Sequence, residues 1–224
     1  MSDVRDRDIV VLALALGSYS AAFGLASSSY GITGTMAVAM SLTMYAGASQ
    51  FAALGILATG GSVVTAVIAV AFINVRFAAL GLSVGPRLPY GPFQRLFAAQ
   101  LMCDPVAALS LAPNDAARAT RVYWRSGIGL FVGWNLGTLL GVIAADRLTD
   151  PEALGLDSAL PAALVGIVVP WLRDRDKRWA AVVGTAIALL LLPLTPAGVP
   201  VIAAGLGGVL AMFLRLHRNS GDGT

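Results

Sequence analysis

The feature that most constrains this chain is a series of long apolar runs that carry almost no charge. A helix needs about 20 mostly apolar residues to cross the hydrocarbon core of a bilayer. No run alternates apolar and polar residues as the strands of a membrane barrel do. We therefore predict an all-α integral membrane protein, a helical bundle of about seven transmembrane helices. The candidate segments are 8–27, 35–56, 62–83, 126–145, 158–172, 179–194 and 199–214.

The composition supports this class of protein. Hydrophobic residues make up 57 % of the chain and charged residues only 12 %, about half the charged share of ordinary globular proteins. So few charges do not cover the surface of a water-soluble domain of this size. Because no Pro/Ser-rich linker divides the chain, we expect a single transmembrane domain over residues 1–224.

Several other functions lack their sequence signals. No basic run is interleaved with aromatic residues, so we expect no nucleic acid among the partners. Cys103 is the only cysteine and His217 the only histidine, which leaves no Cys/His metal cage. The HExxH, GxSxG and P-loop motifs are absent, as is a pore-loop filter. We therefore expect a protein that is not an enzyme and holds no metal or cofactor.

The stretch 96–112 is the least regular apolar run. It is only marginally long enough to cross a membrane, and it contains Asp104 followed by Pro105. Proline lacks a backbone N–H and leaves the carbonyl of Leu101, four residues earlier, without its helical partner. We predict a broken or kinked helix here. A re-entrant pair of half-helices fits the sequence as well as a full eighth crossing.

Charges in the loops indicate the orientation in the membrane. The loop at 173–178, the stretch 113–125 and the tail with Arg215 and Arg218 are basic, whereas the loop at 146–157 is mainly acidic. Basic loops concentrate on the cytoplasmic side, so we predict a multi-pass protein of the cell (inner) membrane with a cytoplasmic C-terminus. The loop charges fit equally well an N-terminus inside with eight crossings and one outside with seven.

Two charges lie inside apolar runs, Arg76 within 62–83 and Asp104 within 96–112. A charge at membrane depth costs about 2.5–3.5 kcal/mol even on insertion scales, so it usually faces an interior cavity or a partner. One charge of each sign suits a zwitterion, with Arg76 at a carboxylate and Asp104 at an ammonium group or a coupling proton. The alternative is a structural ion pair that binds nothing else.

Polar residues near these charges complete a candidate site for substrate binding or coupling. Tyr45 and Ser49 would share one helix face at i,i+4, as would Gln100 and Asp104. Asn74 and Arg76 lie two residues apart, about 200° around a regular helix, so they share one cavity only if the helix unwinds. The full candidate set is Arg76, Asp104, Asn74, Gln50, Ser49, Tyr45, Gln100 and Asn135.

The segment 126–145 carries a double GxxxG ridge formed by Gly133, Gly137 and Gly141. Such ridges let two helix backbones approach closely, so we predict a helix-packing face. Asn135 lies beside the ridge and is a candidate to line the pathway, whereas core packing is the better interpretation of Trp134.

Five motifs occur in order along the chain: Tyr45-Ala46-Gly47-Ala48-Ser49-Gln50-Phe51, Asn74-Val75-Arg76, Asp104 before a small-residue helix, Gly-Thr-Leu-Leu-Gly at 137–141 and Leu160-Pro161-Ala162. This ordered set resembles the AzlC family. The resemblance runs from about residue 10 to 172. It implies the large subunit of a bacterial branched-chain amino acid exporter, which works with a small four-helix AzlD-like membrane subunit by ion-coupled alternating access.

The chain departs from the family pattern at three places. Ser18 stands where a proline is common, Phe77 where a histidine often follows the arginine, and Pro105 where the family has glutamate. The last change bears on coupling and substrate choice. We therefore expect export of branched-chain or similar neutral amino acids and leave the individual substrate and the coupling ion open. The alternatives are a non-transporting structural or regulatory membrane subunit, or a channel.

Overall fold

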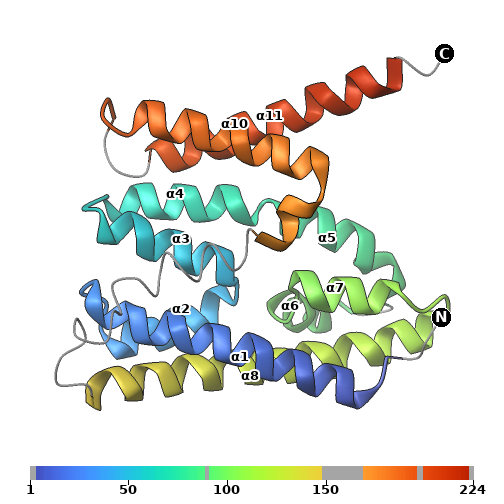
Figure 1. Ribbon diagram of the computed structural model, residues 1–224. Coiled ribbons are helices and arrows are strands. Elements are labelled where there is room, and N and C mark those ends of the chain that lie inside the picture. The colour runs from blue at the N-terminus through green and yellow to red at the C-terminus, as the bar shows by residue number, and fades with distance from the viewer. Residues whose placement is uncertain (1–3, 89–90, 148–168, 196–198, 222–224) are drawn as a thin grey trace. The chain divides into compact units, whose positions relative to one another are not determined.

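The computed structural model describes residues 4–88, 91–147, 169–195 and 199–221. Every regular element in these ranges is a helix, as predicted (Figure 1). The elements are α1 (Asp6–Ser29), α2 (Gly34–Met44), α3 (Gly47–Ala58), α4 (Val63–Asn74), α5 (Arg76–Val84), η1 (Gly85–Arg87), α6 (Pro92–Gln100), α7 (Asp104–Leu111), α8 (Ala116–Arg147), η4 (Val169–Arg173), α10 (Arg175–Leu191) and α11 (Val199–Gly221).

Three helical stretches are long and apolar enough to cross a membrane: Asp6–Ser29, Val63–Arg87 and Ala116–Arg147. Shorter apolar helices occupy Gly34–Met44, Gly47–Ala58 and Val199–Ala211. The predicted all-helical class is therefore confirmed for the described residues, whereas the number of membrane crossings stays a prediction. Most of the predicted segment 158–172 lies outside them.

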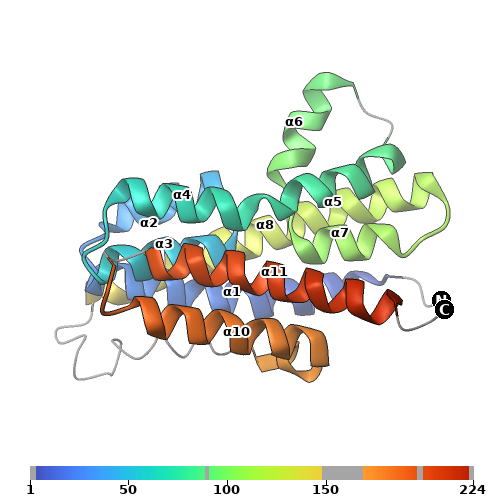
Figure 2. The same cartoon turned by 90° about the horizontal axis from the view of Figure 1, so that it is seen from above.

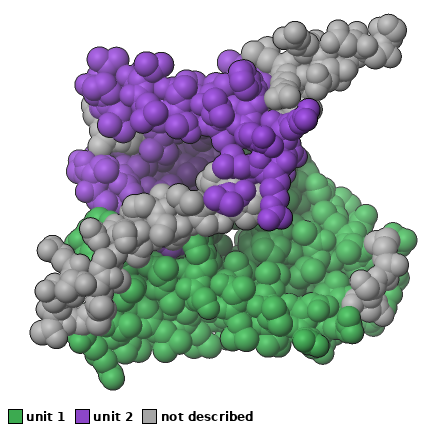
Figure 3. Space-filling model, viewed as in Figure 1, with its two compact units in different colours: residues 1–50, 74–160 green, residues 51–73, 161–224 purple. Residues whose placement is uncertain are grey.

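The described helices gather into two compact units (Figure 3). The first contains residues 1–50 and 74–160, and the second contains residues 51–73 and 161–224. All eight candidate site residues belong to the first unit. The single domain over 1–224 stays a prediction.

Helices α1 and α8 pack closely within the first unit because glycines remove the side chains between them. A Cβ added at Gly133 would lie 2.8 Å from the carbonyl oxygen of Ala13, and one at Gly17 would lie 2.9 Å from that of Gly133. Added side chains at Gly137 and Gly141 would also collide with the backbone of α1. The prediction that this glycine ridge is a packing face is confirmed.

The contacts between α1 and α8 advance along both helices in the same direction. Ile9 lies beside Gly129, and Ala21 lies beside Gly141. Arg125 near the start of α8 pairs with Asp6 at the start of α1. The two helices are therefore parallel, and their N-termini lie at the same end of the first unit (Figure 1).

The prediction of 35–56 as one continuous helix is wrong. Tyr45 separates α2 from α3 with a left-handed backbone conformation, φ 39° and ψ 44°. Such a conformation is rare for a bulky residue and costs about 1–3 kcal/mol. Burial of the side chain and an edge-on ring contact with Phe131, at a centroid distance of 4.9 Å, help to hold Tyr45 there.

The predicted segment 62–83 is interrupted only slightly. Helix α4 ends at Asn74 and α5 begins at Arg76. Val75 between them keeps right-handed helical angles, φ −51° and ψ −31°. The apolar stretch Val63–Arg87 therefore still counts as one membrane-length helical segment of 25 residues.

The predicted break in 96–112 is confirmed. Helix α6 ends at Gln100, and α7 begins at Asp104 with Pro105 in its first turn, where a missing N–H costs no helical hydrogen bond. The break places Gln100 and Asp104 on different helices. The prediction that they share one helix face is therefore wrong.

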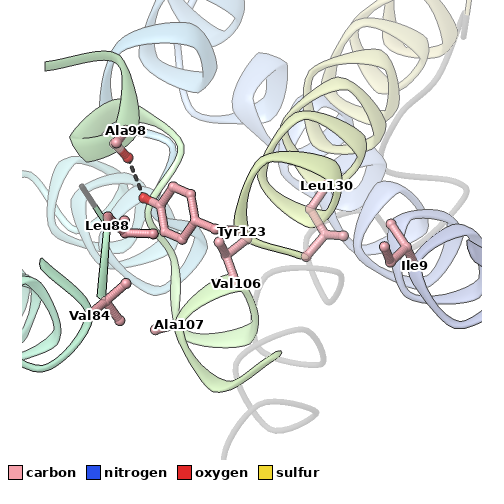
Figure 4. Packing of buried hydrophobic residues seen from close by; sticks show 8 residues of the cluster. All are labelled: Ile9, Val84, Leu88, Ala98, Val106, Ala107, Tyr123 and Leu130. Atoms are coloured by element: carbon pink, nitrogen blue, oxygen red, sulfur yellow. Dashed lines mark hydrogen bonds between the residues drawn. The ribbon is translucent and has the colours of Figure 1, made fainter. Parts of the chain in front are cut away.

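Helices α6 and α7 form a hairpin that leaves one end of the first unit and returns to it. Tyr123 of α8 donates to the carbonyl of Ala98 on α6, whereas Arg87 after α5 donates to the carbonyl of Leu111 at the end of α7, at 2.9 Å. Figure 2 shows α5 and α7 side by side. The buried cluster that these elements form together with α1 is shown in Figure 4: Ile9, Val84, Leu88, Ala98, Val106, Ala107, Tyr123 and Leu130.

Candidate substrate site at the helix breaks

The two charges singled out in the sequence form an ion pair. Arg76 is the first residue of α5 and Asp104 the first of α7, and their Nη1 and Oδ2 atoms lie 3.1 Å apart. The guanidinium also lies over the ring of Phe77, 5.2 Å from its centroid. The side chains are 33 % and 45 % exposed. The pair is therefore formed but accessible, as a site that exchanges partners requires.

Asn74 and Arg76 contact different helices. The hydroxyl of Ser49, fully buried in the first turn of α3, donates to Oδ1 of Asn74. Arg76 instead turns to Asp104 on α7. Two residues that lie two apart on a helix point about 200° away from each other. The segment Asn74–Arg76 therefore contacts α3 on one side and α7 on the other.

Tyr45 and Gln100 connect the break after α2 with the break after α6. The Tyr45 hydroxyl lies 3.6 Å from Sγ of Cys103. The side-chain nitrogen of Gln100 donates to the carbonyls of Leu42 and Thr43, at 2.8 and 3.2 Å. Carbonyls in the last turn of a helix lack partners of their own, so Gln100 caps the end of α2. Since the chain breaks at Tyr45, the predicted helix face shared by Tyr45 and Ser49 is wrong.

Gln50 and Trp134 form a buried polar contact that sequence reasoning missed. The indole N–H of Trp134 on α8 donates to Oε1 of Gln50 on α3 at 3.0 Å. The absence of a side chain at Gly47 makes room for the tryptophan, because a Cβ there would lie 2.5 Å from the ring. A buried tryptophan usually needs an acceptor for its N–H. The need for an acceptor could have indicated that Trp134 has a polar partner, but no pattern in the sequence identified which residue it is.

Asn135 differs from the other candidates. Its side-chain nitrogen donates to the carbonyl of Phe131 one turn earlier on α8, at 2.8 Å. Its side-chain oxygen is buried without a hydrogen-bond partner among the described residues. The structure therefore shows Asn135 bonded within α8 rather than to the other candidates.

The remaining seven candidates lie along a series of contacts between residues far apart in the sequence. The series runs from Trp134 and Gln50 through Ser49 and Asn74, then Arg76 and Asp104, to Cys103 and Tyr45, with Gln100 capping α2. One cation, one anion, hydroxyls and amides are therefore gathered where three helical segments are interrupted. Within the described ranges, no group of three or more His, Cys, Asp or Glu side chains could hold a metal ion.

Comparison with known proteins identifies the family of this chain. The AzlC protein family matches residues 11–148, more than half of the chain and most of the first unit. An uncharacterized membrane protein of Archaeoglobus fulgidus is 31 % identical over 190 residues, covering 84 % of this chain and 83 % of that protein. An uncharacterized membrane protein of Helicobacter pylori is 25 % identical over 174 residues, covering 77 % and 76 %. No solved structure matches. Tyr45, Arg76, Asp104 and the glycine ridge thus lie within the region that matches the family, and the chain belongs to the AzlC family.

Proposed function

We propose that this protein exports branched-chain or similar neutral amino acids by ion-coupled alternating access. The observation that carries the proposal is the accessible Arg76–Asp104 pair at the start of two helices beside a third helix break. Discontinuous helices at membrane depth commonly form the binding sites of secondary transporters. Membership of the AzlC family supports a transport-related role.

The ion pair suggests how a zwitterion would bind. Arg76 would meet the substrate carboxylate, and Asp104 would meet the ammonium group. In this conformation the two side chains satisfy each other. On binding, the Arg76–Asp104 ion pair would be replaced by one ion pair between Arg76 and the substrate carboxylate and one between Asp104 and the substrate ammonium group. Neither charge would then be left uncompensated. Asp104 is also our candidate for carrying a coupling proton.

The direction of the helices supports a cytoplasmic N-terminus. Helix α8 begins within the basic stretch 113–125, which the charge rule places in the cytoplasm. Because α1 is parallel to α8, its N-terminus would lie on the same side. The α6–α7 hairpin leaves this end of the first unit and returns to it, which supports a re-entrant hairpin.

The same reasoning reduces the number of crossings. The segment Val63–Arg87 ends beside α7 at the cytoplasmic end, so Val63 would lie on the outer side. Since α1 also ends outside, the α2–α3 segment would enter from outside and return. We propose six crossings and two re-entrant hairpins, in place of seven or eight crossings. The crossings would be α1, Val63–Arg87, α8, the predicted segment 158–172, α10 and α11.

We propose that the protein resides in the cell (inner) membrane with a cytoplasmic C-terminus. Its proposed partner is a small AzlD-like membrane subunit. The test measures efflux of radiolabelled leucine, isoleucine, valine and methionine from cells that express the chain with and without this subunit. Export of at least one of them, enhanced by the subunit, is expected. If none is exported with the subunit present, the proposed substrate class is wrong.

A structural role is the main rival, and the satisfied Arg76–Asp104 pair is the observation that favours it. Arg76→Gln and Asp104→Asn separate the two functions. Loss of efflux with normal assembly supports transport, whereas loss of folding or of complex formation supports a structural or regulatory subunit. A channel would give flux that never accumulates the amino acid against its gradient.

A further inference from the structure

We infer that the side-chain nitrogen of Gln50 donates a hydrogen bond to the carboxylate of the transported ligand, and that Trp134 orients it for this role. This inference rests on the proposed function, because it assigns a ligand group to the same site. It adds a binding contact separate from the Arg76–Asp104 pair and a positioning residue on α8.

The orientation of the Gln50 amide follows from its partner. Gln50 is fully buried, with 0 % of its surface exposed. Its Oε1 accepts from the Trp134 indole N–H at 3.0 Å. An indole N–H only donates, so it must face the amide oxygen rather than the amide nitrogen. The other end of the amide, Nε2, is therefore directed to a different partner.

That partner is missing from the part of the chain that the structure describes. Nε2 of Gln50 is buried and has no hydrogen-bond acceptor there. Burying a donor without an acceptor is unfavourable, and folded proteins rarely leave one so. An oxygen outside the described residues would complete the hydrogen bonds of this amide, and we assign it to the ligand.

The surroundings favour an anionic oxygen. Gln50 lies in the first turn of α3, a helix of 12 residues, where unpaired backbone N–H groups and the helix dipole attract negative charge. Its neighbour Ser49 is bonded to Asn74, two residues before the cationic Arg76. Nε of Arg76 is likewise buried without an acceptor among the described residues. The charge of Arg76 is offset by Asp104, so the unsatisfied Gln50 donor and the first turn of α3 are the features that favour a carboxylate oxygen.

The geometry also indicates when the ligand would reach Gln50. The nitrogen is sealed from solvent in this conformation, with Trp134 packed against Gly47 in the same turn of α3. A ligand would reach it when the side of the amide that faces away from Trp134 opens during the transport cycle, so that the bond between α8 and α3 is kept. Trp134 would hold the amide in the correct orientation before the ligand arrives.

The test compares three related compounds in proteoliposomes that contain the chain and its small partner. Leucine carries a carboxylate, leucinamide a neutral amide and isopentylamine neither. Gln50→Glu keeps an oxygen for Trp134 but removes the donor, so we expect a KM for leucine at least about 10-fold higher. The KM for isopentylamine should stay unchanged or fall. Gln94→Glu, the same change at an exposed residue of α6, should leave all three values unchanged.

Two more variants keep the outcome decisive. Gln50→Met introduces a side chain of similar shape without a hydrogen-bond donor. It should also raise the KM for leucine more than the KM for isopentylamine. Trp134→Phe should raise the KM for leucine with a smaller change in kcat, because it frees the amide to rotate. The inference is overturned if Gln50→Glu and Gln50→Met affect the three compounds equally or not at all. A change in melting temperature without a change in selectivity would show that Gln50 holds only a buried water. Absence of export by the unmodified protein would instead refute the proposed function.

Discussion

Arg76 and Asp104 pair at 3.1 Å, and each is the first residue of a helix in the first unit. The two residues are brought together because α5 and α7 start at neighbouring points and then run side by side toward the same end. The pair therefore links the N-termini of α5 and α7. The relative position of these two N-termini would have to change if Arg76 or Asp104 bound a ligand instead.

Neutralising one member of this pair should stop transport before it stops folding. Arg76→Gln or Asp104→Asn leaves one charge without its partner, and neither side chain is fully buried within the chain. We expect amino acid efflux to fall at least about 10-fold, because a lost charge-assisted contact weakens binding by this much. Efflux assays normalised to the amount of protein in the membrane check the result.

A combined variant provides the control for this prediction. If the pair were purely structural, Arg76→Gln with Asp104→Asn would restore assembly and leave efflux intact. We expect the double variant to assemble normally and to remain inactive.

Gly137 should tolerate no side chain. A Cβ there would collide with the backbone of Gly17 and the hydroxyl of Ser20, so Gly137→Ala forces α1 away from α8. We expect a loss of about 1–3 kcal/mol in stability, typical of overpacking, seen as a lower melting temperature in detergent.

Gly81 on α5 is the matched control, because a Cβ there would meet no atom within 4 Å. Gly81→Ala should be neutral or stabilising by about 0.5–1 kcal/mol, since alanine favours a helix more than glycine does. Equal effects of the two substitutions would contradict the close packing of α1 and α8.

Gln100 should stabilise the end of α2. Its side-chain nitrogen donates to the carbonyls of Leu42 and Thr43, so Gln100→Leu removes two hydrogen bonds and Gln100→Glu adds repulsion. We expect Gln100→Leu to cost about 1–2 kcal/mol and Gln100→Glu to cost more. Thermal unfolding measures both, and Gln94→Leu on the same helix should have little effect. Equal melting temperatures for Gln100→Leu and Gln94→Leu would rule out the capping role.

The re-entrant hairpins predict which side of the membrane each loop faces. In a Cys103→Ala background, Gly91→Cys and Asn114→Cys flank the α6–α7 hairpin and should react with an impermeant maleimide from the cytoplasmic side. Ser62→Cys, between α3 and α4, should react from the outside. Labelling of positions 91 and 114 from opposite sides would mean that α6 and α7 cross the membrane.

Much of the candidate site could be predicted because its residues are unusual for their setting. Arg76 and Asp104 stand out as charges in apolar runs, and Pro105 identifies a helix break without any knowledge of its neighbours. The helix faces drawn for Tyr45 with Ser49 and for Gln100 with Asp104 were wrong, because both assumed regular helices through positions where the chain turns. Trp134 was read as core, since its acceptor lies on another helix.

The amino-acid sequence by itself determined the membrane class, the glycine ridge and the break at Pro105, because hydropathy, side-chain size and a missing N–H act locally. Only the tertiary structure decided which residues meet: Gln50 with Trp134, Ser49 with Asn74, and α1 parallel to α8. These contacts depend on packing between segments that are distant in the chain. The same packing holds Tyr45 in a strained backbone conformation and brings Arg76 to Asp104, and it results from many contacts acting together.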